Sequence, residues 1–176
     1  MNTEKVIACL KEIGFKPKIA KFSDKVVIQK VVYLLQMKGV KLGFDFGLYV
    51  RGPYSPGLTK EIYSRKGDFE QLKTRTELSG KETEAAKELN EIFDAKPAML
   101  EIAATYAFFA YGQKQDPLTA QKNVKIMKPF FSETQLAVGI NKAKEFLFVP
   151  SERLLKEMKK EFAPWEAASI ESFPKW

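Results

Sequence analysis

A chain of 176 residues with 45% hydrophobic and 29% charged residues has the length and composition of one ordinary globular domain. Its single cysteine and its lack of histidine exclude an internal disulfide, a Ser-His-Asp or Cys-His triad, and a zinc site with histidine ligands. A formal net charge of +7 makes anionic partners a class worth testing.

The first half of the chain predicts three helices and one short strand. Apolar residues at helical spacing predict a helix over 3–13, capped by Thr3, and a second from Ser23 to Gly39. The alternating sequence LGFDFGLYV predicts a strand over 42–50. Ser55 and Pro56 fit the cap and first position of a helix ending near Arg65. The next segment, DFEQLKTRTELSG, alternates weakly and predicts short strands or an irregular wing.

The second half is helical in pattern from Ser79 onward. A helix follows Ser79, and the apolar segment PAMLEIAATYAFFAY predicts a buried central helix. Later helices are expected after Asp116, with Leu118, Val124 and Met127 inward, after the capping box of Ser132 and Gln135, and from Ser151. We expect the tail 162–176, which holds both tryptophans, to dock along the body.

These elements predict a mainly α fold, a helical bundle with a small β element. The order helix, helix, strand, helix and loosely β segment also fits a winged-helix arrangement of the N-terminal half. We expect 1–176 to form a single domain with a basic helix-strand-helix half (1–75) and a helical half (76–176). The sequence shows no signal segment and no apolar run of membrane-spanning length, so we expect a cytoplasmic protein without membrane contact.

The positive charge is confined to the first half. Residues 1–75 hold fifteen Lys and Arg against seven Asp and Glu, whereas 76–176 hold fourteen against fifteen. Clustered cations favour contact with DNA or RNA phosphates, although a solvated lysine-rich face is the alternative. The predicted phosphate-binding residues are Arg51, Lys60, Arg65, Lys66, Lys73 and Arg75.

The stretch YVRGPYSPGL (49–58) combines turn-forming residues with aromatic ones. Its structural interpretation is a stiff corner, in which Gly52 and Pro53 redirect the chain into a helix capped by Ser55. Its functional interpretation is an anion site at that helix N-terminus, with Arg51 and Lys60 in reach. As an interaction corner it comprises Tyr49, Gly52, Pro53, Tyr54, Ser55 and Pro56.

Three functions remain open at this stage. The first is a non-enzymatic nucleic-acid-binding regulator, and the second is a protein-interaction module that uses the corner and the tail. An enzyme using Asp45 or Glu61 is the third, but no phosphate-binding loop and no carboxylate cluster beside a Gly-rich turn supports it. We therefore expect no catalytic centre, no metal and no cofactor, and leave a two-fold homodimer open.

The run VVIQKVVYLLQMKGVKLGFDFGLYVRGPYSPGLTKEI resembles the YwgA-like family of prokaryotic proteins and, more distantly, the Panacea domain of SocA-type antitoxins. The resemblance extends over most of the chain. It implies a mostly helical domain with a small β element, and a protein partner such as a toxin or a role in transcriptional regulation. The residues that carry the pattern are Gln29, Lys30, Tyr33, Gln36, Tyr49, Gly52, Pro53, Tyr54 and Pro56.

Overall fold

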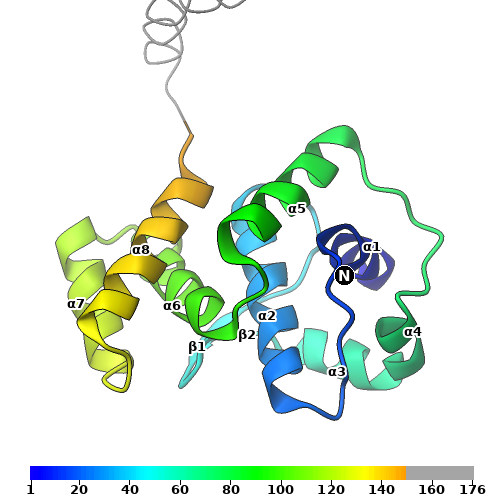
Figure 1. Ribbon diagram of the computed structural model, residues 1–176, viewed down its shortest axis with the longest axis horizontal. Helices are drawn as coiled ribbons and strands as arrows, with labels where there is room; N and C mark the ends of the chain where they lie inside the picture. Colours follow the sequence, from blue (N-terminus) through cyan, green and yellow to red (C-terminus); the bar gives the residue numbers. More distant parts are fainter. Residues whose placement is uncertain (150–176) are drawn as a thin grey trace, which may run out of the picture.

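The computed structural model describes residues 1–149, which form helices and one small antiparallel sheet (Figure 1). The predicted mainly α fold with a small β element is confirmed. The elements are α1 (Thr3–Ile13), α2 (Phe22–Met37), β1 (Gly47–Tyr49), β2 (Gly52–Tyr54), α3 (Pro56–Ser64), α4 (Lys66–Gln71), α5 (Gly80–Phe93), α6 (Pro97–Ala107), a π-helical turn η1 (Phe108–Gly112), α7 (Pro117–Met127) and α8 (Glu133–Leu147).

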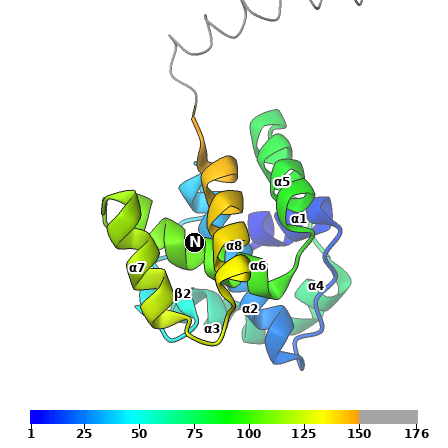
Figure 2. The same ribbon diagram turned by 60° about the vertical axis from the view of Figure 1, so that its left-hand side comes forward.

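Helices α2 and α6 pack against each other in the middle of the bundle. On one side α1 packs against α5, with α3 and α4 nearby, and on the other side α6 carries α7 and α8 (Figures 1 and 2). One hydrophobic core includes residues of both sequence halves, from Val6 and Leu34 to Leu89 and Phe146. The hairpin β1–β2 contacts α2 and α6, so it is held where the two sides meet.

Close helix packing has a clear local cause at Gly139. A Cβ at this position of α8 would lie 2.6 Å from Cγ2 of Ile102 on α6. Because real Cβ atoms do not approach that closely, only glycine lets the two backbones come this near. The apolar segment from Pro97 was predicted to form a buried central helix. The structure agrees, because α6 is buried along Leu100–Ala107 and lies between α2 and α8.

The predicted strand over 42–50 is too long and lacks its partner. Only Gly47–Tyr49 is extended and paired, and it pairs with Gly52–Tyr54, Gly47 opposite Tyr54 and Tyr49 opposite Gly52. The corner is thus the second strand of a hairpin. Val50, the last residue of the predicted strand, lies in the turn and is 81% exposed.

The predicted strands or wing after α3 are wrong. Residues 66–71 form α4 with Phe69 fully buried, and 73–79 contain no strand. The weak alternation in this segment therefore does not mark a sheet face. Within residues 1–149 the only strands precede α3, so nothing there supplies the wing of a winged-helix domain.

Most predicted helix boundaries are confirmed, and three details are not. Asn2, one residue before Thr3, caps α1 by accepting from Lys5 N, and α2 begins at Phe22 without a side-chain cap. Leu118 on α7 was expected inward but is 69% exposed, whereas Val124 is buried.

The expected helix from Ser151 and the docking of the tail 162–176 lie outside the described residues. Among residues 1–149, no helix combines the length and apolarity that a membrane crossing requires.

Candidate functional site

The side chain of Gln29 on α2 holds the corner in place through hydrogen bonds. The Gln29 amide donates to the Ser55 carbonyl (3.0 Å) and to the Thr59 hydroxyl (2.9 Å), and its Oε1 accepts from Ser55 N (2.9 Å). The Ser55 hydroxyl in turn accepts from Leu58 N (3.2 Å) and caps α3, as predicted. Gln29 and Ser55 are both buried, so these bonds are protected from water.

The same contacts narrow the predicted anion site at the N-terminus of α3. Ser55 N and Leu58 N already have side-chain partners inside the protein, and Gly52, Pro53 and Ser55 are buried. These two amides are therefore occupied, and the half-buried Gly57 is the residue of this helix end whose amide is left for an anion. The anion site at this helix end stays a prediction.

A cluster of charged side chains lies beneath the turn of the hairpin. Glu101 of α6 accepts from Lys128 Nζ (2.7 Å) through Oε1 and from Arg51 Nη1 (3.3 Å) through Oε2. Lys128 also donates to the Val50 carbonyl (2.9 Å), and Lys30 of α2 donates to the Pro53 carbonyl (2.6 Å). Lys30, Glu101 and Lys128 are each at most 2% exposed. Lys128 and Arg51 thus share one carboxylate, and Lys30 forms no ion pair with any other residue of 1–149.

Burial and mutual repulsion shift the lysines of this cluster toward their neutral form. The pKa of Lys30 is lowered to about 7, chiefly by burial; Glu101 opposes the shift, and Lys128 and Arg51 contribute to it. Burial also lowers the pKa of Lys128, but its hydrogen bond and charge interaction with Glu101 act in the opposite direction. The positive charge at this point of the core is therefore incompletely balanced.

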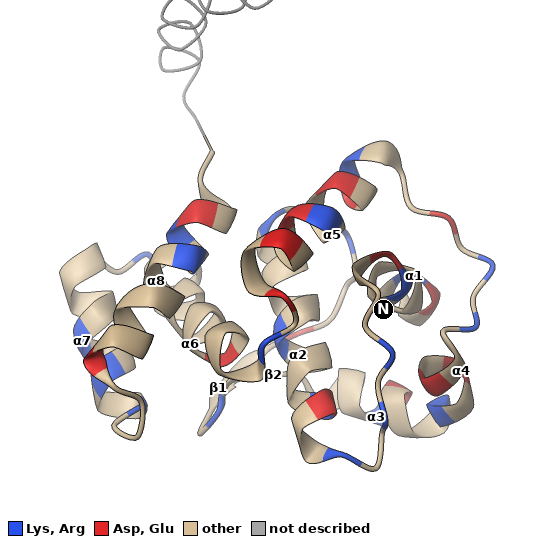
Figure 3. Cartoon of the chain, viewed as in Figure 1, with Lys and Arg blue, Asp and Glu red and all other residues tan. Residues whose placement is uncertain are grey.

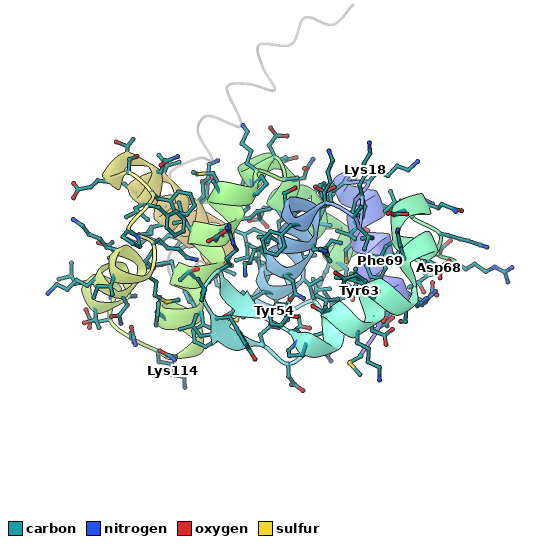
Figure 4. The ribbon with its side chains drawn as sticks, turned by 90° about the horizontal axis from the view of Figure 1, so that it is seen from below. Lys18, Tyr54, Tyr63, Asp68, Phe69 and Lys114 are labelled. Carbon is teal, nitrogen blue, oxygen red and sulfur yellow. The ribbon has the colours of Figure 1, made fainter. Side chains whose placement is uncertain are left out.

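A pocket of about 380 Å³ opens above this cluster, between α2, the hairpin and α3. Four aromatic side chains line it, namely Phe22, Tyr49, Tyr54 and Tyr63, and so do the cations Lys25, Lys30 and Arg51. None of the described residues that line it is acidic. Figure 4 shows Tyr54 and Tyr63 on the same face of the molecule. The lining is apolar and positively charged, and its volume lies in the usual range of small-molecule sites.

The aromatic and cationic side chains of the pocket hold one another in place. The rings of Tyr49 and Tyr54 meet edge to face at 5.0 Å. Arg51 lies over the Phe22 ring at 5.3 Å, and Lys25 donates to the Tyr63 hydroxyl at 2.8 Å. Edge-to-face and cation–π pairs of this kind stabilise a defined orientation. The rim is therefore partly preorganised, although Phe22, Tyr49 and Tyr63 are exposed.

Only one predicted phosphate-binding residue lies at this pocket, Arg51. Lys60 is exposed on α3, and Lys66 is exposed on α4. Lys73 and Arg75 flank Thr74, whose hydroxyl donates to Glu4 of α1, so they lie beside α1 and away from the hairpin (Figure 1). The acidic residues Glu61, Asp68 and Glu70 lie on α3 and α4 among these cations (Figure 3).

Arg65 does not present a free charge. Its guanidinium donates to Glu4 and to Asp68, 2.9 Å away, and these hydrogen bonds raise its pKa. The predicted phosphate contact of Arg65 would therefore require breaking two ion pairs. Lys60, Lys66, Lys73 and Arg75 form no ion pair with any other residue of 1–149.

Sequence reasoning missed much of the site. Phe22 and Tyr63 are exposed and Lys25 is half-buried, and these residues come from two helices whose convergence depends on the fold. Of the buried pair Glu101 and Lys128, only Glu101 had a usable signal in the sequence. A lone acidic residue within the apolar segment MLEIAATYAFFA must find a buried partner. Because that partner lies 27 residues away, the sequence alone does not name it.

These observations define a helical domain with a preformed cationic, aromatic pocket at a β-hairpin. Comparison with family models, with curated proteins and with solved structures finds no match. The resemblance to YwgA-like proteins and to antitoxin domains therefore stays a hypothesis, and function must be argued from the pocket itself.

Replacing Lys30 with methionine is expected to flatten the dependence of stability on pH. An unfolded lysine titrates near 10.4, whereas the pKa of native Lys30 is about 7, so unfolding takes up a proton between these values. The wild-type free energy of unfolding should therefore rise with pH above about 7, and this contribution should be lost in Lys30→Met.

Urea unfolding at about pH 6.5 and about pH 9 measures this difference. Glu101, Lys128 and Arg51, the charged groups that face Lys30, remain in both proteins, as does Cys9, whose pKa burial raises to about 12. Parallel curves for the wild type and Lys30→Met would show that native Lys30 titrates like an ordinary exposed lysine.

Proposed function

We propose that the protein is a non-enzymatic, nucleic-acid-binding regulator whose binding surface belongs to its basic N-terminal half. The observation that carries this proposal is the pocket at the hairpin, because it combines aromatic rings with cations, and no described residue that lines it is acidic. Proteins that bind DNA or RNA use cations for phosphates and aromatic rings for bases. The phosphate contacts are assigned to Arg51, Lys60, Lys66, Lys73 and Arg75.

The exposed lysines outside the pocket lining support the proposal through their unpaired charge. Lys60 follows Thr59, a residue of the pocket lining, and Lys66 begins the next helix. Both side chains lie on the surface without an ion-pair partner in the described part of the chain, so their charge is available to phosphates. Arg65 is left out of the surface because Glu4 and Asp68 already hold its guanidinium.

Fluorescence anisotropy with labelled DNA, as a duplex and as a single strand, tests the proposal. We expect binding at about 50 mM salt that weakens by orders of magnitude at about 200 mM, because each neutralised phosphate releases counterions. In Lys60→Ala/Lys66→Ala the slope of log affinity against log salt should fall by about two, one for each lost contact.

A charge-matched control separates a defined surface from general attraction. Lys81→Ala/Lys122→Ala removes two exposed lysines of the helical half that also form no ion pair in the described residues. The control should keep the wild-type salt slope. Equal losses in both double variants would indicate nonspecific attraction to the net charge, and binding to neither strand form at low salt would overturn the proposal.

A protein-interaction module remains the second candidate, because exposed apolar side chains gather at the same hairpin. Phe22, Tyr49 and Val50 are 61%, 53% and 81% exposed. Such residues are enriched at the centres of protein interfaces. This candidate predicts a partner protein, such as a toxin, that co-purifies with the wild type and is lost in Tyr49→Ala/Val50→Ser. The tail, which it also invokes, lies outside the described residues.

A further inference from the structure

We propose that the hairpin pocket binds one unpaired nucleotide of a nucleic-acid strand, with its base against the aromatic rim and its phosphate beside Arg51 and Lys25. The inference rests on the proposed nucleic-acid function and specifies which form of nucleic acid is recognised. It makes the pocket the point at which the protein distinguishes a single strand from a duplex.

The aromatic rim provides faces for a base. Tyr49 and Tyr63 are more than half exposed, and Tyr54, which touches the Tyr49 ring, closes the pocket from β2. Tyr63 comes from α3 and Phe22 from the start of α2, so rings from two helices and both strands of the hairpin surround one space. A flat, heteroaromatic group that inserts between them is the ligand class that such a space accommodates.

The charges of the pocket favour an anionic ligand. Arg51 and Lys128 share the buried carboxylate of Glu101. The buried Lys30 donates to the Pro53 carbonyl and forms no ion pair with any other residue of 1–149. The Arg51 side chain remains 54% exposed although it is paired, so its guanidinium still faces solvent. Lys25 adds a second cation at the rim. A phosphate at this position would balance charge that the protein leaves unbalanced.

The concave shape of the pocket favours binding of a single strand over binding of a duplex. Bases of a duplex are stacked inside the helix and reach a pocket only after they are flipped out, at a cost of a few kcal/mol. An unpaired nucleotide enters without that cost. The pocket volume of about 380 Å³ lies toward the lower end of the range of about 300–1,000 Å³ for small-molecule sites and suits one nucleotide.

The test compares a labelled single strand with its duplex at one salt concentration, in the wild type and in Tyr63→Ala. We expect the wild type to prefer the single strand, and Tyr63→Ala to lose about ten-fold in single-strand affinity with little change for the duplex. Tyr111→Ala, which truncates an exposed tyrosine of η1 outside the pocket lining, is the matched control and should bind as the wild type does.

Further outcomes distinguish failure of the nucleotide inference from failure of the proposed function. Salt-sensitive duplex binding that equals single-strand binding, with no effect of Tyr63→Ala, would overturn the nucleotide inference and leave the proposed function standing. No binding of either form would overturn both. Competition with a nucleoside monophosphate and with inorganic phosphate identifies the source: displacement from the single strand by the former alone supports base recognition, whereas equal displacement by phosphate overturns it.

Discussion

Replacing Glu101 with glutamine is expected to lower the free energy of unfolding by about 3–5 kcal/mol. Within residues 1–149, Glu101 is the only carboxylate that contacts Lys128, whose side chain is fully buried, and it also pairs with Arg51. Removing one partner of a buried ion pair leaves the other charge without compensation in a medium of low polarity. Urea denaturation followed by circular dichroism measures the loss.

Two companion variants show whether the loss comes from the buried charge. Glu101→Gln/Lys128→Met removes both charges and should recover most of the stability, because an apolar replacement of a buried pair is often neutral. Glu88→Gln breaks the pair with Lys38 (2.8 Å), which is more exposed, and should cost no more than about 1 kcal/mol. A double variant as unstable as the sum of its single changes would contradict the pairing of Glu101 with Lys128.

The sequence predicted the features that depend on neighbouring residues. Ser132 and Gln135 form a capping box and Ser55 caps α3, as expected, because a cap is satisfied within one helical turn. The predicted end of the first helix at residue 13 is confirmed, and the left-handed Gly14 that follows it terminates α1. For these elements the sequence pattern and the local geometry carry the same information.

The features that were missed depend on contacts between distant segments. Strand β2 has only three residues and was taken as part of a turn, because a three-residue strand has almost no alternation to detect. The expected wing is α4, where burial of Phe69 in the core decides the local conformation. Residues that are 50 positions apart, Arg51 and Glu101, meet only after α6 has packed against α2.

The pocket was predicted only in part, because it combines residues that are neighbours in the sequence with residues from distant segments. The corner residues Tyr49, Gly52 and Tyr54 line the pocket. The sequence could single them out because they lie close together in the chain and the composition of that stretch is unusual. Lys30 was noted only as part of a family pattern, and its role as a buried cation becomes visible when Pro53 and Glu101 are placed around it. Charge counted along the chain does not separate a paired cation such as Arg65 from a free one.

Replacing Gly52 with alanine is expected to destabilise the protein by about 2–4 kcal/mol, for two separate reasons. Gly52 has φ +82°, a left-handed conformation that costs an alanine about 1–2 kcal/mol. A Cβ there would also lie 2.3 Å from Oγ1 of Thr105, which donates to the Glu101 carbonyl (2.7 Å). Thermal or urea unfolding measures the combined effect.

Two variants separate backbone strain from steric overlap at this position. Gly14→Ala places a Cβ at a similar φ of +73° with nothing within 4 Å, so it should lose only about 1–2 kcal/mol from backbone strain. In the Thr105→Ala background the obstructing hydroxyl is absent, and Gly52→Ala should then cost no more than Gly14→Ala. An undiminished loss in that background would mean that strain alone makes Gly52 necessary. Recovery would show that the hairpin, and with it the pocket, is positioned by contact with α6.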